Sequence, residues 1–423
     1  MKILFLTENY PPETNAAANR VHERAKFWSD WGHEVTVITC GPNFPKGRIH
    51  DGYKNRWYQS EVMDGIKVVR VKTFINPNEG VILRMLDFLS FMVTGFFASL
   101  VQRRPDVVVA TSPQFFTAVA GWMVGLCRRR PFVLELGDIW PASIVAVGAM
   151  QESILIRILE RLELFLYRRS NAIVALTPSF KKNLVNRGID GNKISIVING
   201  VDTSRFQRSP RDDVLAAEWG LSDSFVIGYI GTHGMAHGLS NVLDTAAHLD
   251  GNEHVKFLFV GDGAERDGLI SQAADRNLDN VLFVSSQPRE KVPNIWSVCD
   301  VALVHLRDTE VFSEVIPSKI FEAMAMGLPI LLVTPQGIAS YIVLSTRSGL
   351  WVPAEKPAEL ANLAASLAGR KRLLAMLGRN GEKASGRFSR KRQAEEMLQI
   401  LEISAAGWGQ RAGIGHDVEN YAG

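Results

Sequence analysis

Short apolar runs alternate with helical segments along nearly the whole chain, and this alternation limits the available folds more than any other feature. The opening residues show the unit: "KILFLT" has the character of a buried strand, "NAAANRVHERAKFWSDWG" has helical spacing with a glycine stop, and "HEVTVIT" is a second strand. A strand, a helix and a strand of these lengths predict a parallel sheet that is covered by helices. We therefore expect an α/β protein.

The alternation comes in two series that a polar stretch at residues 202–224 separates. The first continues through "IKVVRV", "PDVVVATS", "PFVLELG", "NAIVALT" and "ISIVING", and the second runs through "FVIGYIG", "VKFLFVG", "VLFVS", "VALVHL" and "PILLV". A chain of 423 residues also exceeds what one hydrophobic core usually serves. We therefore expect two doubly wound, Rossmann-like domains that face each other across a cleft, with ligands bound past the carboxyl ends of the strands.

The domain boundaries follow from the same pattern. We place the first domain at residues 1–205 and the second at residues 206–385. The segment "SRKRQAEEMLQILEISA" predicts a closing helix within residues 386–402 that packs back toward the first domain. Residues 403–423, rich in glycine and polar side chains, are expected to form a flexible tail.

Charge and cysteine usage narrow the function classes. The formal net charge is only +3, which does not indicate a nucleic-acid partner. Cys40, Cys127 and Cys299 are scattered and suit the reduced, buried thiols of a cytoplasmic protein. The N-terminus turns polar and proline-rich too early for a signal peptide. There is no DxD triplet and no paired set of His and Cys residues, so we predict no required metal.

An apolar stretch raises the question of membrane contact. Residues 88–101 carry no charge and are followed by Arg103 and Arg104. The stretch is shorter than the roughly 20 residues of a spanning helix. It predicts either a mostly buried helix or a helix that lies on an anionic membrane face and is anchored by its arginines.

One stretch brings acidic, basic and helix-starting residues together: "EVIPSKIFEAMAMG", residues 314–327. Pro317 fits the first turn of a helix, so Glu314 is predicted to lie in a loop and Glu322 about one turn into the helix. Between them lie the amides of the helix start, its dipole and Lys319, which together form a ready anion site. The two carboxylates can accept hydrogen bonds from sugar hydroxyls, while the helix start and Lys319 between them hold a diphosphate. The alternative is that Glu314 and Lys319 are simply solvated.

Two glycine-rich loops follow strands of the second series. In "YIGTHGMAHG", Gly231, Gly234 and Gly238 let the backbone approach a ligand before a helix begins. The spacing is not GxGxxG and no acidic residue about 20 positions on is placed to hold a ribose, so a nicotinamide cofactor is not expected. In "FVGDGAERDGL", Gly261 and Gly263 can admit a flat base. For both loops the alternative is an ordinary glycine turn at a strand end.

In the first domain, "LELGDIWPAS" puts Asp138 just past a strand end, where it faces the expected cleft. The alternative is a turn aspartate that caps the next segment.

These features together resemble the retaining glycosyltransferases of the GT-B fold, family 4. The resemblance rests on the pair Glu314 and Glu322, on "VINGVD" with Phe206 behind it, on "NYPPETNAAANRVHE" and on the closing helix, and it spans residues 1–402. Within the family, "YPPETNAAANRVHERAKFW", "GPNFPKGRIHDGYKNRW" and "GDIWPASI" are most similar to bacterial polysaccharide or lipopolysaccharide enzymes, particularly N-acetyl-L-fucosamine transferases.

The resemblance implies a nucleotide sugar, expected to be a UDP-sugar, held by the second domain as co-substrate, with no other cofactor required. Glu322 would bind the ribose hydroxyls, and Glu314 would contact the donor sugar. The amides of Ser318, Lys319 and Ile320, with the Lys319 amine, would face the diphosphate.

The other implied roles fall on loops. Gly261 and Gly263 would border the base. The second-domain glycine loop would approach the phosphates through Gly231, Thr232, His233 and His237. In the first domain, residues Asn15, Ala16, Ala17 and Ala18 would close over the phosphates and the donor sugar. Asp138 would act on the acceptor side, so the catalytic assignments are Glu314, Lys319 and Asp138.

The chain departs from the family pattern at two places. The first loop reads "TNAAAN" where the family usually has a glycine pair. Thr232 and His237 stand where the family has a phosphate-binding Arg and Lys. Lys319, His233, His237 and the helix dipole are the groups that can compensate, and a contribution from histidine would make activity depend on its protonation.

The implied reaction transfers a sugar, expected to be an N-acetylamino-deoxy sugar, with retention of anomeric configuration. The expected acceptor is a polyprenyl-diphosphate-linked or other lipid-linked saccharide of a bacterial surface polysaccharide, reached from the cytoplasmic membrane face. Preorganised amides and one lysine can stabilise the leaving diphosphate without a metal. We favour a front-face route in which the leaving phosphate accepts the proton of the acceptor. Two alternatives stay open: a GT-B nucleotide-sugar epimerase and a non-catalytic nucleotide-sugar-binding subunit.

Overall fold

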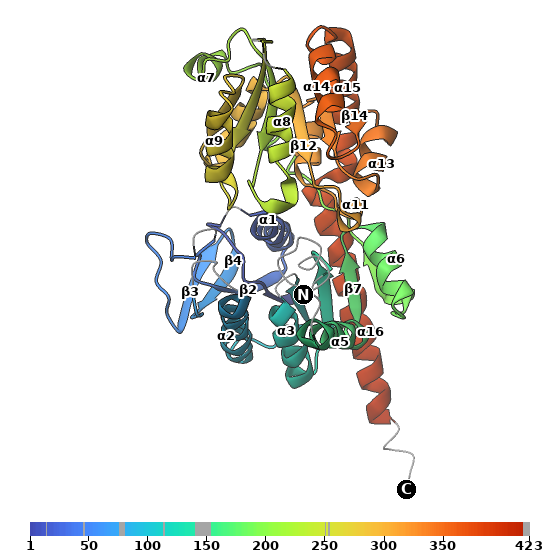
Figure 1. Cartoon of the computed structure of the whole chain (residues 1–423). Helices are drawn as coiled ribbons and strands as arrows, with labels where there is room; N and C mark the ends of the chain where they lie inside the picture. The colour runs from blue at the N-terminus through green and yellow to red at the C-terminus, as the bar shows by residue number, and fades with distance from the viewer. Residues whose placement is uncertain are drawn as a thin grey trace. The chain divides into compact units, whose positions relative to one another are not determined.

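The computed structural model describes residues 1–13, 15–44, 47–75, 81–112, 115–139, 154–249, 251–252 and 254–417. The chain divides into two compact units, Met1–Ile198 with Arg390–Gly423, and Asn199–Ser389 (Figure 1). The boundary falls after Ile198 rather than after residue 205, because the start of the second unit pairs with its end. Val201 forms a parallel bridge with Ser389, and its amide donates to the carbonyl of Phe388 at 2.8 Å.

The first unit is built on an eight-stranded sheet with the order β3-β4-β2-β1-β5-β6-β7-β8. Only the β3–β4 pair is antiparallel among these strands. Because the order runs outward from β1 in both directions, the sheet is doubly wound, and β1 and β5 mark its switch point. The strands are β1 Lys2–Leu6, β2 Glu34–Cys40, β3 Tyr58–Met63, β4 Ile66–Val71, β5 Val107–Thr111, β6 Phe132–Leu136, β7 Ala172–Ala175 and β8 Ile194–Ile196.

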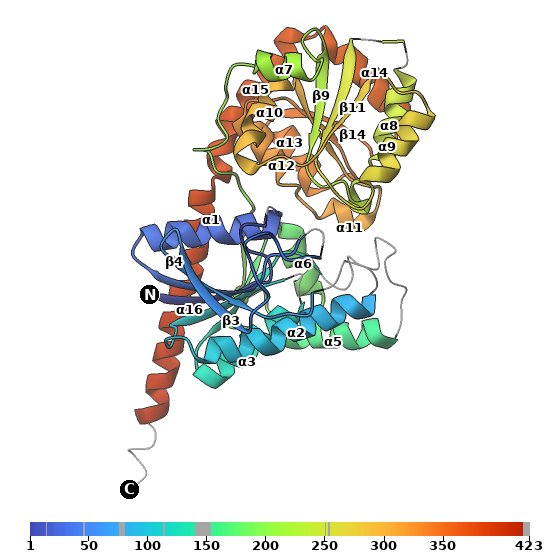
Figure 2. The same ribbon diagram turned by 90° about the vertical axis from the view of Figure 1, so that its left-hand side faces the viewer.

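Helices cover both faces of this sheet (Figure 2). They are α1 Ala16–Asp30, α2 Val81–Leu100, α3 Phe115–Arg128, α5 Ile154–Arg169, α6 Pro178–Asn186 and α16 Arg390–Asp417. Alternate residues of β1 enter two different cores, as the period of a strand requires. Leu4 and Leu6 belong to the core of α2, α3 and α5, and Ile3 and Phe5 belong to the core of α1 and α16.

The second unit has a six-stranded, fully parallel sheet with the order β11-β10-β9-β12-β13-β14. Its strands are β9 Phe225–Ile230, β10 Val255–Val260, β11 Val281–Val284, β12 Val301–His305, β13 Ile330–Val333 and β14 Gly349–Val352. Phe225, Ile227 and Tyr229 of β9 share one core with residues of α8, α9 and α14. The helices are α7 Asp213–Glu218, α8 Ser240–His248, α9 Arg266–Asp275, α10 Val292–Val298, α11 Glu310–Ser313, α12 Lys319–Ala325, α13 Ile338–Ser345, α14 Pro357–Ala368 and α15 Lys371–Ser385.

The closing helix α16 is longer than the sequence pattern predicted. It starts at Arg390, packs on α1 of the first unit, and continues to Asp417 instead of ending near residue 402. Residues 403–417 are therefore helical and not a flexible tail, and residues 418–423 lie outside the described part. The indole of Trp408 donates to the carbonyl of Arg129 at 3.1 Å, which ties the added turns to the end of α3.

Candidate functional site

The segment from α11 to α12 carries the acid–lysine–acid arrangement in the second unit. α11 ends at Ser313, Glu314 follows it, and α12 begins at Lys319. Glu322 lies in the first turn of α12, so the two acids occupy the local structure that Pro317 predicts. Both carboxylate side chains are half-buried.

The helix start offers fewer amides than expected. The amide of Ile320 donates to the carbonyl of Pro317 at 3.1 Å, and the amides of Phe321 and Glu322 donate to the carbonyl of Ser318. Ile320 is fully buried as well. The predicted role of the Ile320 amide at the diphosphate is therefore not supported, because a tight turn already occupies it. Among the described residues, the amides of Ser318 and Lys319 have no such backbone carbonyl partner.

Lys319 is a buried lysine without a hydrogen-bond acceptor among the described residues. Its Nζ lies 3.4 Å from the centroid of the Tyr229 ring. Burial lowers the pKa of Lys319 to about 7, against the attraction of Glu322. The predicted alternative of a solvated lysine does not hold: the amine is held inside the protein, over an aromatic face.

The glycines of the two loops have close neighbours that explain them without a ligand. Gly231 has φ +145°, and a β-carbon there would meet Lys319 Nζ at 3.0 Å. A β-carbon on Gly261 would lie 1.9 Å from the carbonyl oxygen of Gly231, and one on Gly263 would lie 2.4 Å from that of His233. The loops after β9 and β10 thus pack backbone against backbone. This packing alone requires glycine at these positions, whether or not the loops also contact a nucleotide base.

The histidines of this region are neutral at pH 7. His233 is fully buried against Tyr229 and Phe259, and both of its ring nitrogens lack partners among the described residues. Burial lowers the pKa of His233 to about 4 and that of His237 to about 3. Protonated histidine is therefore not available near pH 7 to replace the missing Arg and Lys, and the cationic role falls to Lys319.

His237, Thr232 and Tyr229 shape the loop instead. The carbonyl of His237 contacts Nδ1 of His305 at 2.6 Å, in the tautomer that puts the proton on Nδ1. The Tyr229 hydroxyl donates to the carbonyl of Thr232 at 2.7 Å, while the Thr232 side chain itself is exposed. Tyr229 was not predicted as a site residue, although it directly precedes the loop, because its side chain reads as a core residue of the strand.

A second residue that the sequence did not single out contacts Glu322. Nε1 of Trp296, on α10, donates to Oε2 of Glu322 at 3.3 Å, and Trp296 is fully buried. The indole therefore holds one carboxylate oxygen of Glu322 in place. In the sequence, "NIWSV" reads as an ordinary amphipathic helix, and no local pattern links it to a residue 26 positions later.

In the first unit, residues 15–18 start a helix and do not form a loop. α1 begins at Ala16, Asn15 is its N-cap, and the Asn15 side chain accepts from the amide of Ala18 at 2.9 Å. Ala18 is fully buried. These four residues form the N-terminus of α1. The part that would cover a bound donor is therefore the end of a helix and not a loop.

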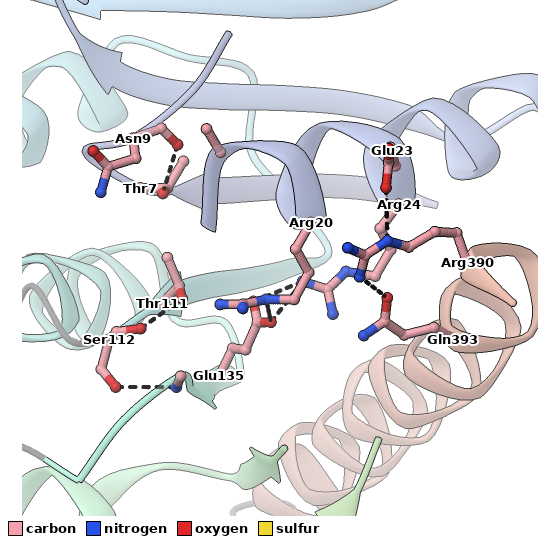
Figure 3. Close-up of polar contacts among 12 residues, drawn as sticks. Thr7, Asn9, Arg20, Glu23, Arg24, Thr111, Ser112, Glu135, Arg390 and Gln393 are labelled. Atoms are coloured by element: carbon pink, nitrogen blue, oxygen red, sulfur yellow. Dashed lines mark hydrogen bonds and ion pairs between the residues drawn. The ribbon is translucent and has the colours of Figure 1, made fainter. Parts of the chain in front are cut away.

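Behind this helix start lies a buried ionic cluster (Figure 3). Nη2 of Arg24 lies 2.7 Å from both oxygens of Glu135, and Nε of Arg20 lies 2.8 Å from Oε1. Burial alone would raise the pKa of Glu135, but the guanidinium groups of Arg24 and Arg20 lower it below its ordinary value. Arg390, the first residue of α16, pairs with Glu23 at 2.6 Å. The cluster joins α1, β6 and α16.

Asp138 lies past the end of β6, as predicted. Its carbonyl accepts from the Ser112 hydroxyl at 3.2 Å. With Ser112, Phe115, Glu163 and Tyr167, it lines a cavity of about 10 Å³, which is room for about one water. The adjoining "WPAS", residues 140–143, lies outside the described residues. Asp138 is thus placed at the carboxyl edge of the sheet, and the cavity that it lines with other described residues is much smaller than a sugar.

The apolar helix α2 is neither wholly buried nor free of the core. Leu83–Leu100 is long and apolar enough to cross a membrane, and 22% of that window is buried. Phe91 and Ala98 pack into the core, whereas Phe97 is 62% exposed and Val101, just past the helix, is 72% exposed. One side of α2 packs against the sheet of its own unit. The other side exposes apolar side chains, and an exposed apolar surface of this kind calls for a binding partner.

No group of three His, Cys, Asp or Glu side chains that could hold a metal ion occurs among the described residues.

Sequence comparisons match each unit with a family of known proteins. The family described as "Glycosyl transferase 4-like domain" matches residues 15–200, and "Glycosyl transferases group 1" matches residues 213–384. A protein of Escherichia coli K12 named as a colanic acid biosynthesis glycosyl transferase is 26% identical over 336 residues, covering 77% of this chain and 82% of the relative. A GDP-mannose-dependent alpha-mannosyltransferase of Mycobacterium tuberculosis is 24% identical over 363 residues, covering 84% of each chain.

Solved structures share the fold. The Anabaena protein HepE, solved in complex with UDP and glucose, has a TM-score of 0.72 at 20% identity and covers 95% of this chain and 99% of its own. The predicted architecture of two Rossmann-like domains is confirmed by this likeness.

Proposed function

Because the chain belongs to the group 1 glycosyltransferases of the GT-B fold, we propose that it transfers a sugar from a nucleoside-diphosphate donor to a lipid-linked saccharide with retention of anomeric configuration. The second unit would hold the donor, and the first unit would hold the acceptor. The observation that carries the proposal is the arrangement around α12, where Glu314, Lys319 and Glu322 surround a helix start.

The donor roles follow from what each group can accept or donate. The half-buried Glu322, oriented by Trp296, would accept hydrogen bonds from the two ribose hydroxyls. Lys319 and the amides of Ser318 and Lys319 would meet the diphosphate, and Glu314 would contact the donor sugar. We expect a UDP-sugar carrying an N-acetylamino-deoxy sugar, as in the enzymes that the sequence resembles. The mannosyltransferase relative makes a GDP-sugar the first alternative to test.

The chemical problem is the negative charge that develops on the leaving diphosphate. Fixed amides and a lysine inside a dry site stabilise such charge without reorganising. A front-face route, in which the leaving phosphate accepts the proton of the acceptor hydroxyl, needs no nucleophile under the anomeric carbon. We therefore assign Glu314 and Lys319 to donor orientation and charge stabilisation, and Asp138 to the acceptor side, in a reaction that requires no metal.

The acceptor side is proposed to work at the cytoplasmic face of a membrane. The packed layer of α2, α3 and α5 exposes Phe97, Val101 and Leu126, with Ile158 on α5. The same helices and the turns that follow them carry exposed arginines, at positions 84, 103, 104, 129, 157, 161, 168 and 169. Exposed apolar side chains and arginines on the same helices fit an anionic lipid surface. Such a surface would present a polyprenyl-diphosphate-linked saccharide of a surface polysaccharide, in keeping with the colanic acid relative.

The proposal is tested by an assay of purified protein against UDP- and GDP-sugars, with and without lipid-linked acceptors. We expect nucleoside diphosphate and a glycosylated lipid to appear together, with retained anomeric configuration by NMR. Glu322→Gln should remove most of the activity, while Glu310→Gln, an exposed acid on α11, should leave it unchanged. Full transfer by Glu322→Gln would overturn the donor assignment. Conversion of a UDP-sugar without acceptor would indicate an epimerase instead.

A further inference from the structure

The amine of Lys319 has an environment that does not match a permanently charged lysine. Nζ is buried and has no hydrogen-bond acceptor among the described residues. Its nearest support is the face of the Tyr229 ring, 3.4 Å away at the centroid. An aromatic face stabilises an ammonium by less than the burial of a charge costs.

The groups around the amine leave it as the main titrating cation near neutral pH. The ionisable groups that face it are one acid on its own helix, one tyrosine on β9 and three histidines on β9–α8 and β12, namely Glu322, Tyr229, His233, His237 and His305. Burial lowers the pKa values of the three histidines to between about 3 and about 4, so they stay neutral. Burial raises the pKa of Tyr229 well above its ordinary value, so its hydroxyl keeps its proton.

An arriving diphosphate changes this environment, because its oxygens supply the acceptors that burial has removed. We propose that Lys319 takes up a proton when the diphosphate binds, so that the site captures a nucleoside diphosphate together with one proton from solvent. The neutral amine becomes an ammonium that pairs with phosphate oxygens. This inference rests on the proposed donor site and goes beyond it by making donor affinity depend on pH.

The sign of the effect follows from linkage. Burial lowers the pKa of Lys319 to about 7 in the free protein, and a neighbouring anion raises it in the complex. Below pH 7 the lysine is already charged, so binding takes up few protons. Between the free and the bound pKa, binding takes up nearly one proton, and affinity falls about tenfold for each unit of rising pH.

The decisive measurement is isothermal titration of the full-length protein with UDP at pH 7.5 and 8.5. In this range the terminal phosphate of UDP, with a pKa of about 6, is almost fully ionised. Each titration is repeated in phosphate-free buffers of different ionisation enthalpy, which reports the protons taken up. We expect uptake to approach one proton at pH 8.5 and the dissociation constant to rise five- to tenfold between the two pH values.

Three variants identify the group. Lys319→Met should bind UDP at least tenfold more weakly at pH 7.5 and take up no proton. Tyr229→Phe keeps the ring face and should retain the proton uptake, and disappearance of the uptake in this variant would contradict the assignment to Lys319. His237→Gln should also retain the proton uptake. If the uptake disappeared in this variant, the histidine and not Lys319 would be the group that is protonated. If Lys319→Met does not fold, as circular dichroism would reveal, the wild-type uptake and the other two variants still decide the question.

The outcomes separate this inference from the donor assignment. If neither UDP nor GDP binds at any pH, the donor site itself is misassigned. If UDP binds with the same affinity at both pH values and without proton uptake, the donor assignment stands and the proton coupling at Lys319 is wrong.

Discussion

A β-carbon placed on Gly231 would lie 3.0 Å from Nζ of Lys319, so the glycine after β9 and the lysine of α12 occupy adjoining space. The contact joins the glycine loop to the acid–lysine–acid segment within one unit. Lys319 can keep its position only if residue 231 has no side chain, and this requirement does not depend on any ligand.

Gly231→Ala should therefore damage donor binding as well as stability. The substitution forces a side chain into a backbone conformation with φ +145° and displaces the amine. We expect a loss of about 1–3 kcal/mol in the free energy of unfolding and at least tenfold weaker UDP binding. Gly268→Ala on α9, where a β-carbon meets nothing within 4 Å, is the matched control and should be neutral or slightly stabilising. Equal UDP affinity in both variants would contradict the contact.

Trp296→Phe should weaken donor binding by releasing one oxygen of Glu322. The indole donates to that carboxylate at 3.3 Å, and phenylalanine keeps most of the buried volume while it removes the donor. We expect the KM for the donor to rise about tenfold, or about 1.4 kcal/mol, with little change in kcat. Trp351→Phe, which loses a similar bond to the Thr334 carbonyl away from the site, should leave the KM unchanged. A fall in kcat alone would argue against an orienting role.

Glu135→Gln should be strongly destabilising. It leaves the buried guanidinium groups of Arg24 and Arg20 without a carboxylate, which costs about 3–5 kcal/mol. Since Glu135 has a lowered pKa in the folded protein, its contribution is present at neutral pH and fades as the pH falls through that pKa. Urea unfolding at pH 7 and pH 4 measures both effects. Asp30→Asn, which breaks an exposed pair with Lys26, should cost less than about 1 kcal/mol.

Asp87→Asn should stabilise the protein at high pH only. Burial raises the pKa of Asp87 from 3.8 to about 6, so between these values the folded state holds a proton that the unfolded chain releases. Stability from this group is therefore lost as the pH rises through about 6. We expect Asp87→Asn to raise the Tm by a few degrees at pH 7.5 and not at pH 4. The exposed Asp51→Asn should show no difference at either pH.

Charging the outer side of α2 should abolish membrane binding. Phe97→Glu combined with Val101→Glu alters two exposed apolar side chains, each worth about 1.5–3 kcal/mol when buried in lipid. Co-sedimentation with phosphatidylglycerol-containing vesicles should fall at least tenfold. Val62→Glu, on the edge strand β3 and 76% exposed, is the matched control and should bind as the wild type does. Unchanged binding by the double variant would remove this surface from consideration.

Much of the architecture could be predicted because strands and helices leave local patterns. Two strands escaped detection, and the reasons differ. β3 alternates exposed and half-buried residues at the sheet edge and has no buried apolar run, whereas β14 is short and begins with a glycine. The end of α16 was also missed, since "GWGQ" reads as a stop while the Trp408 contact that holds it comes from a distant segment.

The site divides in the same way. Pro317 allowed the positions of Glu314 and Glu322 to be inferred, because its effect on the backbone is local. Tyr229 and Trp296 could not be found, since their importance lies in contacts with Lys319 and Glu322 on other elements. Arg24 and Glu135 stand 111 positions apart, and nothing in the sequence pairs them. Local sequence patterns therefore predict helices and strands, whereas the contacts between distant side chains become known only from the folded structure.

The return of the chain from the second unit into α16 has a consequence for synthesis on the ribosome. Ala394, Met397 and Leu401 fill the core that α1 shares with the sheet of the first unit. These residues are translated only after the whole of the second unit, roughly 10–40 s after the rest of the first at ordinary elongation rates. Until then the nascent first unit carries an uncovered apolar face beside Trp28. The helix α16 therefore covers this apolar face only at the end of synthesis. Truncation before α16 would leave the face exposed, and a chaperone would have to shield it.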